Sequence, residues 1–293
     1  FHPIVAGMTL SNFHFASYPQ SDQALLYYPY SFFLTGAWRT GVLPLWNPFS
    51  LGGVGMLTNG QGTVYPVRIL LALVFSPALT HDLFLALHVF ASGFFMLLFM
   101  KELRLRFPAA LLGAVAWMFA SFNTMWMQDE VGLPLFALLP LVLLLVHYAA
   151  RKRSWRIAAA AGLPLGLLAV GAQLELVAVA LVISGGYAVG LTLERMWSGR
   201  RSGVDWFRLA LPMVTVVLGV GIAAIVLIPS ALIATQAARA PYSYSTFSRL
   251  HTIPVANFRY ALSGGPRDVF TFTQRCMFVG LAPFFLAFIG FCR

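Results

Sequence analysis

Residues 131–156 read VGLPLFALLPLVLLLVHYAARKRSWR, and this stretch decides the class of fold. Its first nineteen residues contain no Asp, Glu, Lys or Arg, and about 20 apolar residues are enough for a helix to cross a bilayer. Pro134 and Pro140 lie inside the run, where a membrane helix packed against neighbours tolerates them. The four basic residues that follow are typical of a cytoplasmic loop. The stretch therefore predicts a membrane-spanning helix that ends in the cytoplasm.

The composition of the whole chain agrees with this prediction. Of the 293 residues, 59% are hydrophobic and only 10% are charged, whereas an average soluble domain has about 25% charged residues. These values exclude an ordinary soluble enzyme, a disordered chain and a coiled coil. The formal net charge is +10, but the basic loops of membrane proteins produce such an excess, so it does not indicate a nucleic-acid partner. We therefore predict an all-α polytopic membrane protein.

Seven apolar segments follow residue 80, and most of them are near the length of a membrane span. They are 83–100, 108–127, 131–149, 157–172, 174–193, 209–228 and 277–292. The loops after the first, third and fifth segments hold eleven Lys and Arg residues, whereas the short loops 128–130 and 173–175 hold none. This alternation predicts cytoplasmic loops at 101–107, 151–156 and 194–208. Residues 1–80 and 229–276 are then predicted to lie on the outer side of the membrane, opposite the cytoplasm.

The chain is thus expected to consist of an outer first loop, 1–80, and a transmembrane bundle, 81–293. An outer first loop requires an earlier crossing, and the last apolar segment is short for a span, so we expect the protein to continue beyond both ends. The first loop is rich in Tyr and Trp, which favour the membrane–water boundary. We predict short helices at 22–40 and 64–76 that lie in the interface plane. The prolines and glycines between them predict irregular turns.

Two further features of the sequence each have a functional and a structural interpretation. The segment GLPLG at 162–166 has the spacing of a helix-dimer motif, but the proline inside it favours ordinary packing between helices.

Asp22 is the single acidic residue before Asp82. Because Ser21-Asp22 precedes an apolar run, the structural interpretation of this acid is a helix N-cap.

The first loop also resembles a known family through a set of short motifs. They are Asp22-Gln23, Tyr28-Pro29-Tyr30, Pro44-Leu45-Trp46-Asn47-Pro48, Gly52-Gly53, Asn59-Gly60-Gln61 and Tyr65-Pro66. In this order they resemble the first outer loop of YfhO-like bacterial membrane proteins, which belong with the GT-C glycosyltransferases. A looser match continues through His88, Gly171-x-Gln173, Arg239 and Tyr242–Tyr244. The resemblance covers roughly 20 to 260.

This resemblance implies a GT-C bundle in the bacterial cytoplasmic membrane. Such an enzyme takes a sugar from a polyprenyl-phosphate donor and passes it outside the membrane to a glycan, lipid or protein acceptor of the envelope. The resemblance also implies that Asp22 acts as general base or as a metal ligand. The residues of the matching motifs are then the candidates for binding substrate, and they are Gln23, Tyr28, Trp46, Asn47, Gln61, His88, Gln173 and Arg239.

The remaining acidic residues of the outer loops offer a metal site or a second candidate acid. Asp129 and Glu130 could bind a divalent ion such as Mg²⁺ or Mn²⁺, with Asp22 completing an oxygen site. The alternative is a solvated turn that simply needs polar residues. Glu175 lies between two apolar segments, and a carboxylate at membrane depth is usually functional. We include it among the substrate-binding candidates, with capping of the 174–193 helix as the alternative.

Basic and imidazole side chains complete the list of candidates. His81 and His88 are seven residues apart and so share a helix face. They could contact a phosphate, or they could bond to a neighbouring helix. Seven arginines fall in the two long outer regions, and surface solvation explains most of them. Arg239 is our first choice for the departing phosphate, because arginine grips phosphate with a planar fork.

Two other functions compete with the transferase hypothesis. A transporter or flippase for a lipid-linked glycan would place charges at the midplane of broken helices, whereas the acids here cluster at loop ends. A non-catalytic subunit for envelope assembly would tolerate replacement of Asp22. The chain contains no Walker loop, Rossmann fingerprint or H-E-x-x-H motif, so a soluble nucleotide-sugar enzyme is not indicated.

Overall fold

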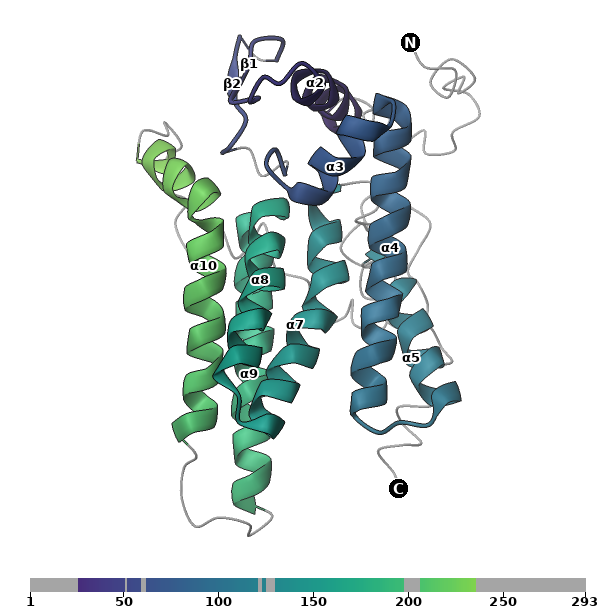
Figure 1. Cartoon of the computed structure of the whole chain (residues 1–293), viewed down its shortest axis with the longest axis vertical. Coiled ribbons are helices and arrows are strands. Elements are labelled where there is room, and N and C mark those ends of the chain that lie inside the picture. Colours follow the sequence, from purple (N-terminus) through teal and green to yellow (C-terminus); the bar gives the residue numbers. More distant parts are fainter. Residues whose placement is uncertain are drawn as a thin grey trace, which may run out of the picture.

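The structure is a computed structural model that describes residues 26–50, 52–58, 62–120, 123–124, 130–197 and 206–235. These residues form a bundle of helices with a small layer across one end (Figure 1). The bundle helices are α4 (Pro77–Glu102), α5 (Phe107–Met118), α7 (Leu133–Lys152), α8 (Trp155–Gly171), α9 (Leu174–Trp197) and α10 (Trp206–Ala234). A short 3-10 turn, η2 (Glu130–Gly132), leads directly into α7. The predicted all-α membrane class is confirmed.

Four of these helices are long and apolar enough to cross a membrane. They are Pro77–Glu102, Glu130–Lys152, Leu174–Glu194 and Ala210–Ile233, while α5 and α8 are shorter apolar helices. Helix α4 has 26 residues, so it is about 39 Å long, which exceeds the hydrocarbon thickness of a bilayer. The first six predicted apolar segments each overlap one helix. The last, 277–292, lies outside the described residues.

Helix α5 ends earlier than its predicted segment. The apolar run extends to residue 127, but the helix stops at Met118. The buried side chain of Asn123 donates a hydrogen bond to the carbonyl of Trp117, and the Trp117 indole donates to the carbonyl of Phe136 on α7 at 3.1 Å. The amide thus adds a second hydrogen bond to a carbonyl at the end of the helix, which also accepts from the Ala120 amide at 3.3 Å.

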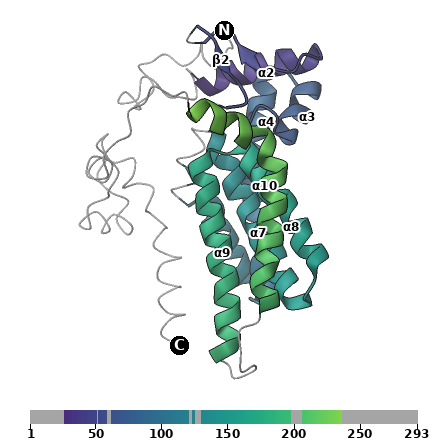
Figure 2. The ribbon, with the colours of Figure 1, turned by 90° about the vertical axis from the view of Figure 1, so that its left-hand side faces the viewer.

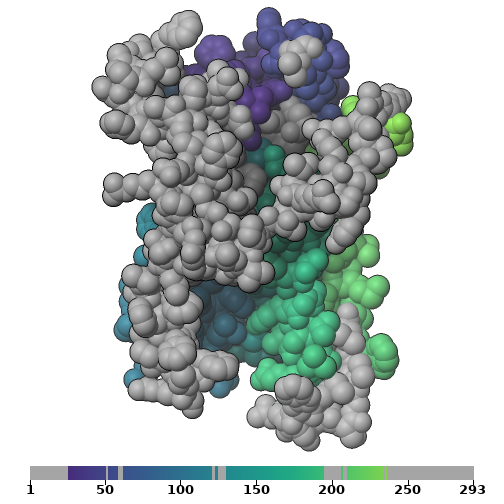
Figure 3. Space-filling view, turned by 180° about the vertical axis from the view of Figure 1, so that it is seen from behind, coloured from purple at the N-terminus to yellow at the C-terminus, as the bar shows by residue number. Residues whose placement is uncertain are grey.

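Helix α7 forms the centre of the bundle and packs against α4, α8 and α9. Of its apolar span 72% is buried, compared with 17% of the span of α10. Helix α9 lies on the back of the bundle (Figures 2 and 3). A helix so enclosed must be apolar all round, and this explains the uninterrupted apolar run of residues 131–149.

Glycines bring α8 and α10 into close contact. A Cβ added at Gly166 would come within 2.6 Å of the Ile222 side chain, and one added at Gly162 within 2.7 Å of Leu218. The hydroxyl of Thr215 donates to the carbonyl of Ala158 on α8 at 2.8 Å. The GLPLG segment therefore serves packing within the chain, as its proline predicts, because small residues let two helix backbones approach.

The small layer across one end is hereafter the cap. It comprises α2 (Tyr28–Arg39), β1 (Trp46–Asn47), β2 (Val54–Gly55) and α3 (Pro66–Val74). Both predicted helices of the first loop are present. Between them the turns are not wholly irregular, because β1 and β2 pair antiparallel with Trp46 opposite Gly55.

Arg39 ties the two cap helices together. Its guanidinium donates to the carbonyl of Ala72 at 2.9 Å and to that of Phe75 at 2.5 Å. Ala72 lies in the last turn of α3 and Phe75 is its C-cap residue, where backbone acceptors lack partners in the helix. The bonds thus hold the C-terminal end of α2 beside that of α3.

The basic loops 101–107 and 151–156 lie at the end of the bundle opposite the cap (Figure 1). Helices α4 and α7 both begin near the cap, and their far ends meet where Arg151 pairs with Glu102 at 2.6 Å. That end carries most of the basic residues that the structure describes, among them Lys101, Arg104, Arg106, Arg151, Lys152, Arg153 and Arg156. The alternation of basic and neutral loops in the sequence therefore corresponds to the two ends of one bundle.

Candidate functional site

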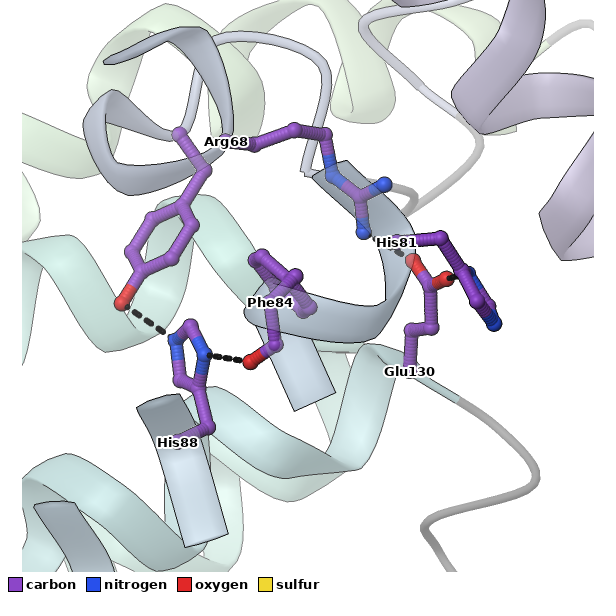
Figure 4. Close-up of polar contacts among 6 residues, drawn as sticks. Arg68, His81, Phe84, His88 and Glu130 are labelled. Atoms are coloured by element: carbon purple, nitrogen blue, oxygen red, sulfur yellow. Dashed lines mark hydrogen bonds and ion pairs between the residues drawn. The ribbon is translucent and has the colours of Figure 1, made fainter. Parts of the chain in front are cut away.

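Polar side chains from three elements meet beneath the cap (Figure 4). Tyr65 and Arg68 come from the start of α3, His81 and His88 from the first half of α4, and Glu130 from η2. All five side chains are buried. Such a concentration of polar groups between apolar helices needs internal partners, because a buried polar group without one is costly.

Glu130 is the centre of a buried ion cluster. The Arg68 guanidinium donates to one carboxylate oxygen of Glu130, and His81 pairs with the other. The relative exposures are 1% for Glu130, 3% for Arg68 and 5% for His81. The guanidinium also lies over the Phe84 ring, with 4.2 Å to its centroid. Charge pairing and the cation–π contact together offset the desolvation of these groups.

This cluster corrects two expectations. Glu130 is buried and does not lie in a solvated turn. Arg68 is also buried and does not lie on a solvated surface. The sequence did contain a signal, because Arg68 stands alone among apolar residues in PVRILLALV. A lone charge in such a helix faces either solvent or a buried counter-ion, and only the packing of α3 on the bundle distinguishes the two.

Tyr65 and His88 form a second buried contact next to this cluster. The Nδ1 of His88 lies 2.7 Å from the carbonyl of Phe84, and its Nε2 lies 3.0 Å from the Tyr65 hydroxyl. A carbonyl only accepts, so Nδ1 carries the proton and the Tyr65 hydroxyl donates to Nε2. Burial raises the pKa of Tyr65, so the hydroxyl stays protonated. The structure therefore agrees with bonding of His88 to a neighbouring element, one of the two alternatives for this residue.

Helix α2 contacts the ion cluster through Tyr28. Its ring lies edge-on to that of His81, with centroids 5.8 Å apart. Tyr28 is also the first residue of α2. Asp22 and Gln23 precede it by a few positions in the sequence but lie outside the described residues, as do Gln61, Asp129 and Arg239.

Trp46 and Asn47 take different roles in the hairpin. The Asn47 amide is buried and internally bonded, since its Oδ1 accepts from the Phe49 amide at 2.9 Å and its Nδ2 donates to the Ser50 hydroxyl at 3.3 Å. Trp46 is 58% exposed. Its indole lies against Gly53, where an added Cβ would come within 2.1 Å of the ring and where φ is +121°. Gly53 thus lets the indole lie flat on the backbone.

A groove of about 860 Å³ separates α2 from residues 42–50. Tyr28, Phe32, Phe33, Trp46 and Phe49 supply its aromatic lining. This volume is within the usual range of ligand sites, which are concave and mostly apolar. The groove is therefore a candidate binding site, and three of the predicted substrate-binding residues, Tyr28, Trp46 and Asn47, line it.

The α8–α9 turn carries the other described candidates. The carbonyl of Gln173 accepts from the amides of Leu176 and Val177, which begin α9, at 3.0 and 3.1 Å. Glu175 is exposed in the first turn of α9, the position that the capping alternative requires. The neighbouring Gly171 lies against Tyr65, with 3.0 Å from an added Cβ to that ring. This turn is thus at the cap end, next to the Tyr65–His88 contact.

The described part of the chain does not provide a metal site at Glu130. Both of its carboxylate oxygens are engaged, by Arg68 and by His81, and a cation there would face an arginine. Among the described residues no group of three or more His, Cys, Asp and Glu side chains could hold a metal ion. Asp22 and Asp129 are not described, so a metal held by these two acids stays a prediction.

Sequence reasoning missed a second polar cluster at the basic end. Glu102 pairs with Arg151 at 2.6 Å, and His147 Nδ1 lies 2.7 Å from the hydroxyl of Tyr187 on α9. His147 Nε2 also lies 4.0 Å from Glu102. These contacts join α4, α7 and α9. The spacing of His147 and Arg151, four residues apart on α7, was the available signal, because such residues share a helix face.

Comparison of the chain with protein-family models, with curated proteins and with solved structures finds no match in any of the three.

Proposed function

We propose that this protein is a membrane glycosyltransferase of the GT-C type. It transfers a sugar from a polyprenyl-phosphate donor to a glycan, lipid or protein acceptor of the bacterial envelope. The reaction takes place at the cap end, which faces the outside of the cytoplasmic membrane. Asp22 is the general base.

The observation that best supports this proposal is the position of the cap. It covers the end of the bundle opposite the basic loops (Figure 1), and basic loops favour the cytoplasm. The cap contains most of the motifs through which the chain resembles GT-C enzymes. It also contains the groove of about 860 Å³, so the motifs and a ligand-sized site occur together at that end.

In the proposed glycosyl transfer, Asp22 and Arg239 each have a defined role. The acceptor hydroxyl attacks the anomeric carbon of the sugar, and the bond from that carbon to the phosphate oxygen breaks. The hydroxyl proton passes to the Asp22 carboxylate. The departing phosphate keeps the bonding electrons and needs positive charge nearby. Arg68 is bonded to Glu130 and Arg39 to backbone carbonyls, so Arg239 remains our candidate for that phosphate.

A divalent ion, if Asp22 and Asp129 hold one, would supply further positive charge for the phosphate. Glu130 is engaged by Arg68 and His81, and the proton transfer above does not depend on the ion. Transfer assays with and without a chelator test this part of the proposal.

The decisive experiment compares Asp22→Asn with wild type in membranes that contain equal amounts of the full protein. The substrate is a polyprenyl-phosphate-linked radiolabelled sugar, and Asp82→Asn is the matched control, since Asp82 is exposed at the start of α4. We expect Asp22→Asn to lower transfer by about 100-fold or more, because it removes the base, while the control keeps wild-type transfer. Equal transfer by both variants would contradict the role of Asp22, and no transfer by wild type would contradict the enzyme proposal.

A further inference from the structure

Two short turns, one between α4 and α5 and one between α7 and α8, gather basic residues at the end of the bundle opposite the cap (Figure 1). The ion pair of Arg151 with Glu102, at 2.6 Å, holds the ends of α4 and α7 together, so the two turns are neighbours. Residues 101–107 and 151–156 are hereafter the basic face.

The charge of the basic face is one-sided. It contains seven Lys and Arg residues and one acid, Glu102, so its formal net charge is seven minus one, or +6. That acid is already paired with Arg151. Glu194, near the end of α9, is the other acid that the structure describes at this end of the bundle, and counting it still leaves +5. The basic face therefore complements an anionic ligand.

Exposed apolar side chains alternate with these cations. In the segment LRLRF of residues 103–107 every second side chain is apolar, and all five are exposed. The second turn exposes Trp155, one position before Arg156, and tryptophan favours the membrane–water boundary. A soluble anion, a nucleic acid or an acidic protein needs only the charges, whereas apolar side chains between cations can enter a bilayer surface. The alternation thus favours a lipid headgroup as the anion.

Arginine occupies a left-handed backbone position in each turn. The φ of Arg104 is +62° and that of Arg153 is +52°, and the other described residues with a positive φ are glycines. This conformation at the end of a helix is typical of glycine, and any other side chain adopts it at a cost in strain. Turn geometry therefore does not explain arginine at either position, whereas both exposed side chains add charge to the basic face.

We infer that the basic face binds the headgroups of anionic phospholipids, with its arginines on the phosphates and its apolar side chains at the boundary with the acyl chains. The level in the membrane agrees, because α4 has 26 residues and outspans the hydrocarbon layer, so its end lies among the headgroups. Anionic lipid gathers at such basic segments on the cytoplasmic leaflet, the side predicted for these loops. This binding is separate from the proposed sugar transfer.

The two left-handed positions provide a variant that removes charge without straining the fold. Arg104→Gly/Arg153→Gly removes two of the seven cations, and glycine adopts a positive φ freely. The matched control, Arg104→Lys/Arg153→Lys, keeps both charges at the same positions. Lys152→Gln/Arg156→Gln removes two exposed cations at other positions of the basic face. It carries the same expectation as the glycine variant, so the test remains if the glycine variant does not fold.

The experiment titrates the delipidated full protein in detergent with dioleoyl phosphatidylglycerol or dioleoyl phosphatidylcholine, and native mass spectrometry counts the bound lipids. We expect the wild type to bind phosphatidylglycerol more tightly. Each cation near a membrane surface strengthens such binding about fivefold, so the glycine variant should bind phosphatidylglycerol about tenfold or more weakly. Its binding of phosphatidylcholine, and both affinities of the lysine control, should stay at the wild-type values.

Equal affinity of the wild type for the two lipids would overturn the inference, because the cations would then only solvate the end of the bundle. Wild-type binding of phosphatidylglycerol by folded charge-removing variants would overturn it as well, since the lipid would then lie elsewhere. Displacement of phosphatidylglycerol by an excess of glycerol 3-phosphate would identify a site for soluble phosphate instead of lipid. None of these outcomes bears on the role of Asp22, which the transfer assay tests by itself.

Discussion

The buried pair of Arg68 and Glu130 allows a quantitative prediction about stability. Glu130→Gln keeps the size of the side chain but removes its charge. The Arg68 guanidinium, 3% exposed, then loses its carboxylate partner, and its Nε has no hydrogen-bond partner among the described residues. Removing one member of such a pair leaves an uncompensated buried charge, which costs about 3–5 kcal/mol. We expect the free energy of unfolding to fall by that amount.

A second ion pair between helices serves as the matched control. Glu102 pairs with Arg151, whose side chain is 39% exposed. Water can solvate the arginine when its partner is neutral, so Glu102→Gln should cost only about 1 kcal/mol. The double variant Arg68→Met/Glu130→Gln should cost less than Glu130→Gln alone, because no charge is then left unpaired in the protein interior.

The measurement is unfolding of the detergent-solubilised protein in increasing SDS, followed by circular dichroism for all four proteins. Equal losses in Glu130→Gln and Glu102→Gln would refute the reasoning, since burial would then not decide the cost. A double variant at least as unstable as Glu130→Gln alone would refute it as well, because removal of the Arg68 charge would then not relieve the loss.

Three further predictions follow from packing and hydrogen bonding. Gly166→Leu should destabilise the protein by about 1–3 kcal/mol through overpacking of α8 on α10, whereas Gly190→Leu on α9, where an added Cβ meets nothing within 4 Å, should be neutral; equal thermal stability of the two in detergent would contradict the α8–α10 contact. Gly53→Ala should displace the indole of Trp46, because the added methyl occupies its place; an unchanged fluorescence spectrum in a variant with Trp46 as sole tryptophan would exclude this. Tyr65→Phe removes the donor to a buried histidine nitrogen and should cost about 1–3 kcal/mol, measured in the SDS titration, where no loss would argue against that bond.

Part of the candidate site was accessible to prediction from the sequence. His81 and His88 share a face of α4, as their spacing predicts, and both are buried at the cap end. Trp46 lines a groove, but the amide of Asn47 serves the turn of the hairpin instead of projecting into solvent. A motif identifies neighbours in the chain, and it does not say which of them turns inward. Strand pairing and the local turn settle that.

The opposite environments of two acids illustrate the limit of local reasoning. Glu130 and Glu175 both stand beside an apolar segment. The structure buries Glu130 and exposes Glu175, whereas the sequence suggests a carboxylate at membrane depth for Glu175, with capping of its helix as the alternative. The difference arises because α3 brings Arg68 onto Glu130, while no comparable described element lies over the start of α9. Burial of a charge depends on a distant partner, so neither outcome follows from flanking hydropathy.

The sequence by itself determined the membrane class, the places of six bundle helices and the two helices of the cap. These follow from the length, hydropathy and turn residues of each segment, which are local properties of the chain. The tertiary structure alone decided that Arg68 meets Glu130, 62 positions apart, that the GLPLG glycines contact α10, and that α2 and the hairpin enclose a groove. Each of these requires one particular packing of helices, and the apolar faces of membrane helices are too alike for local sequence to specify their neighbours.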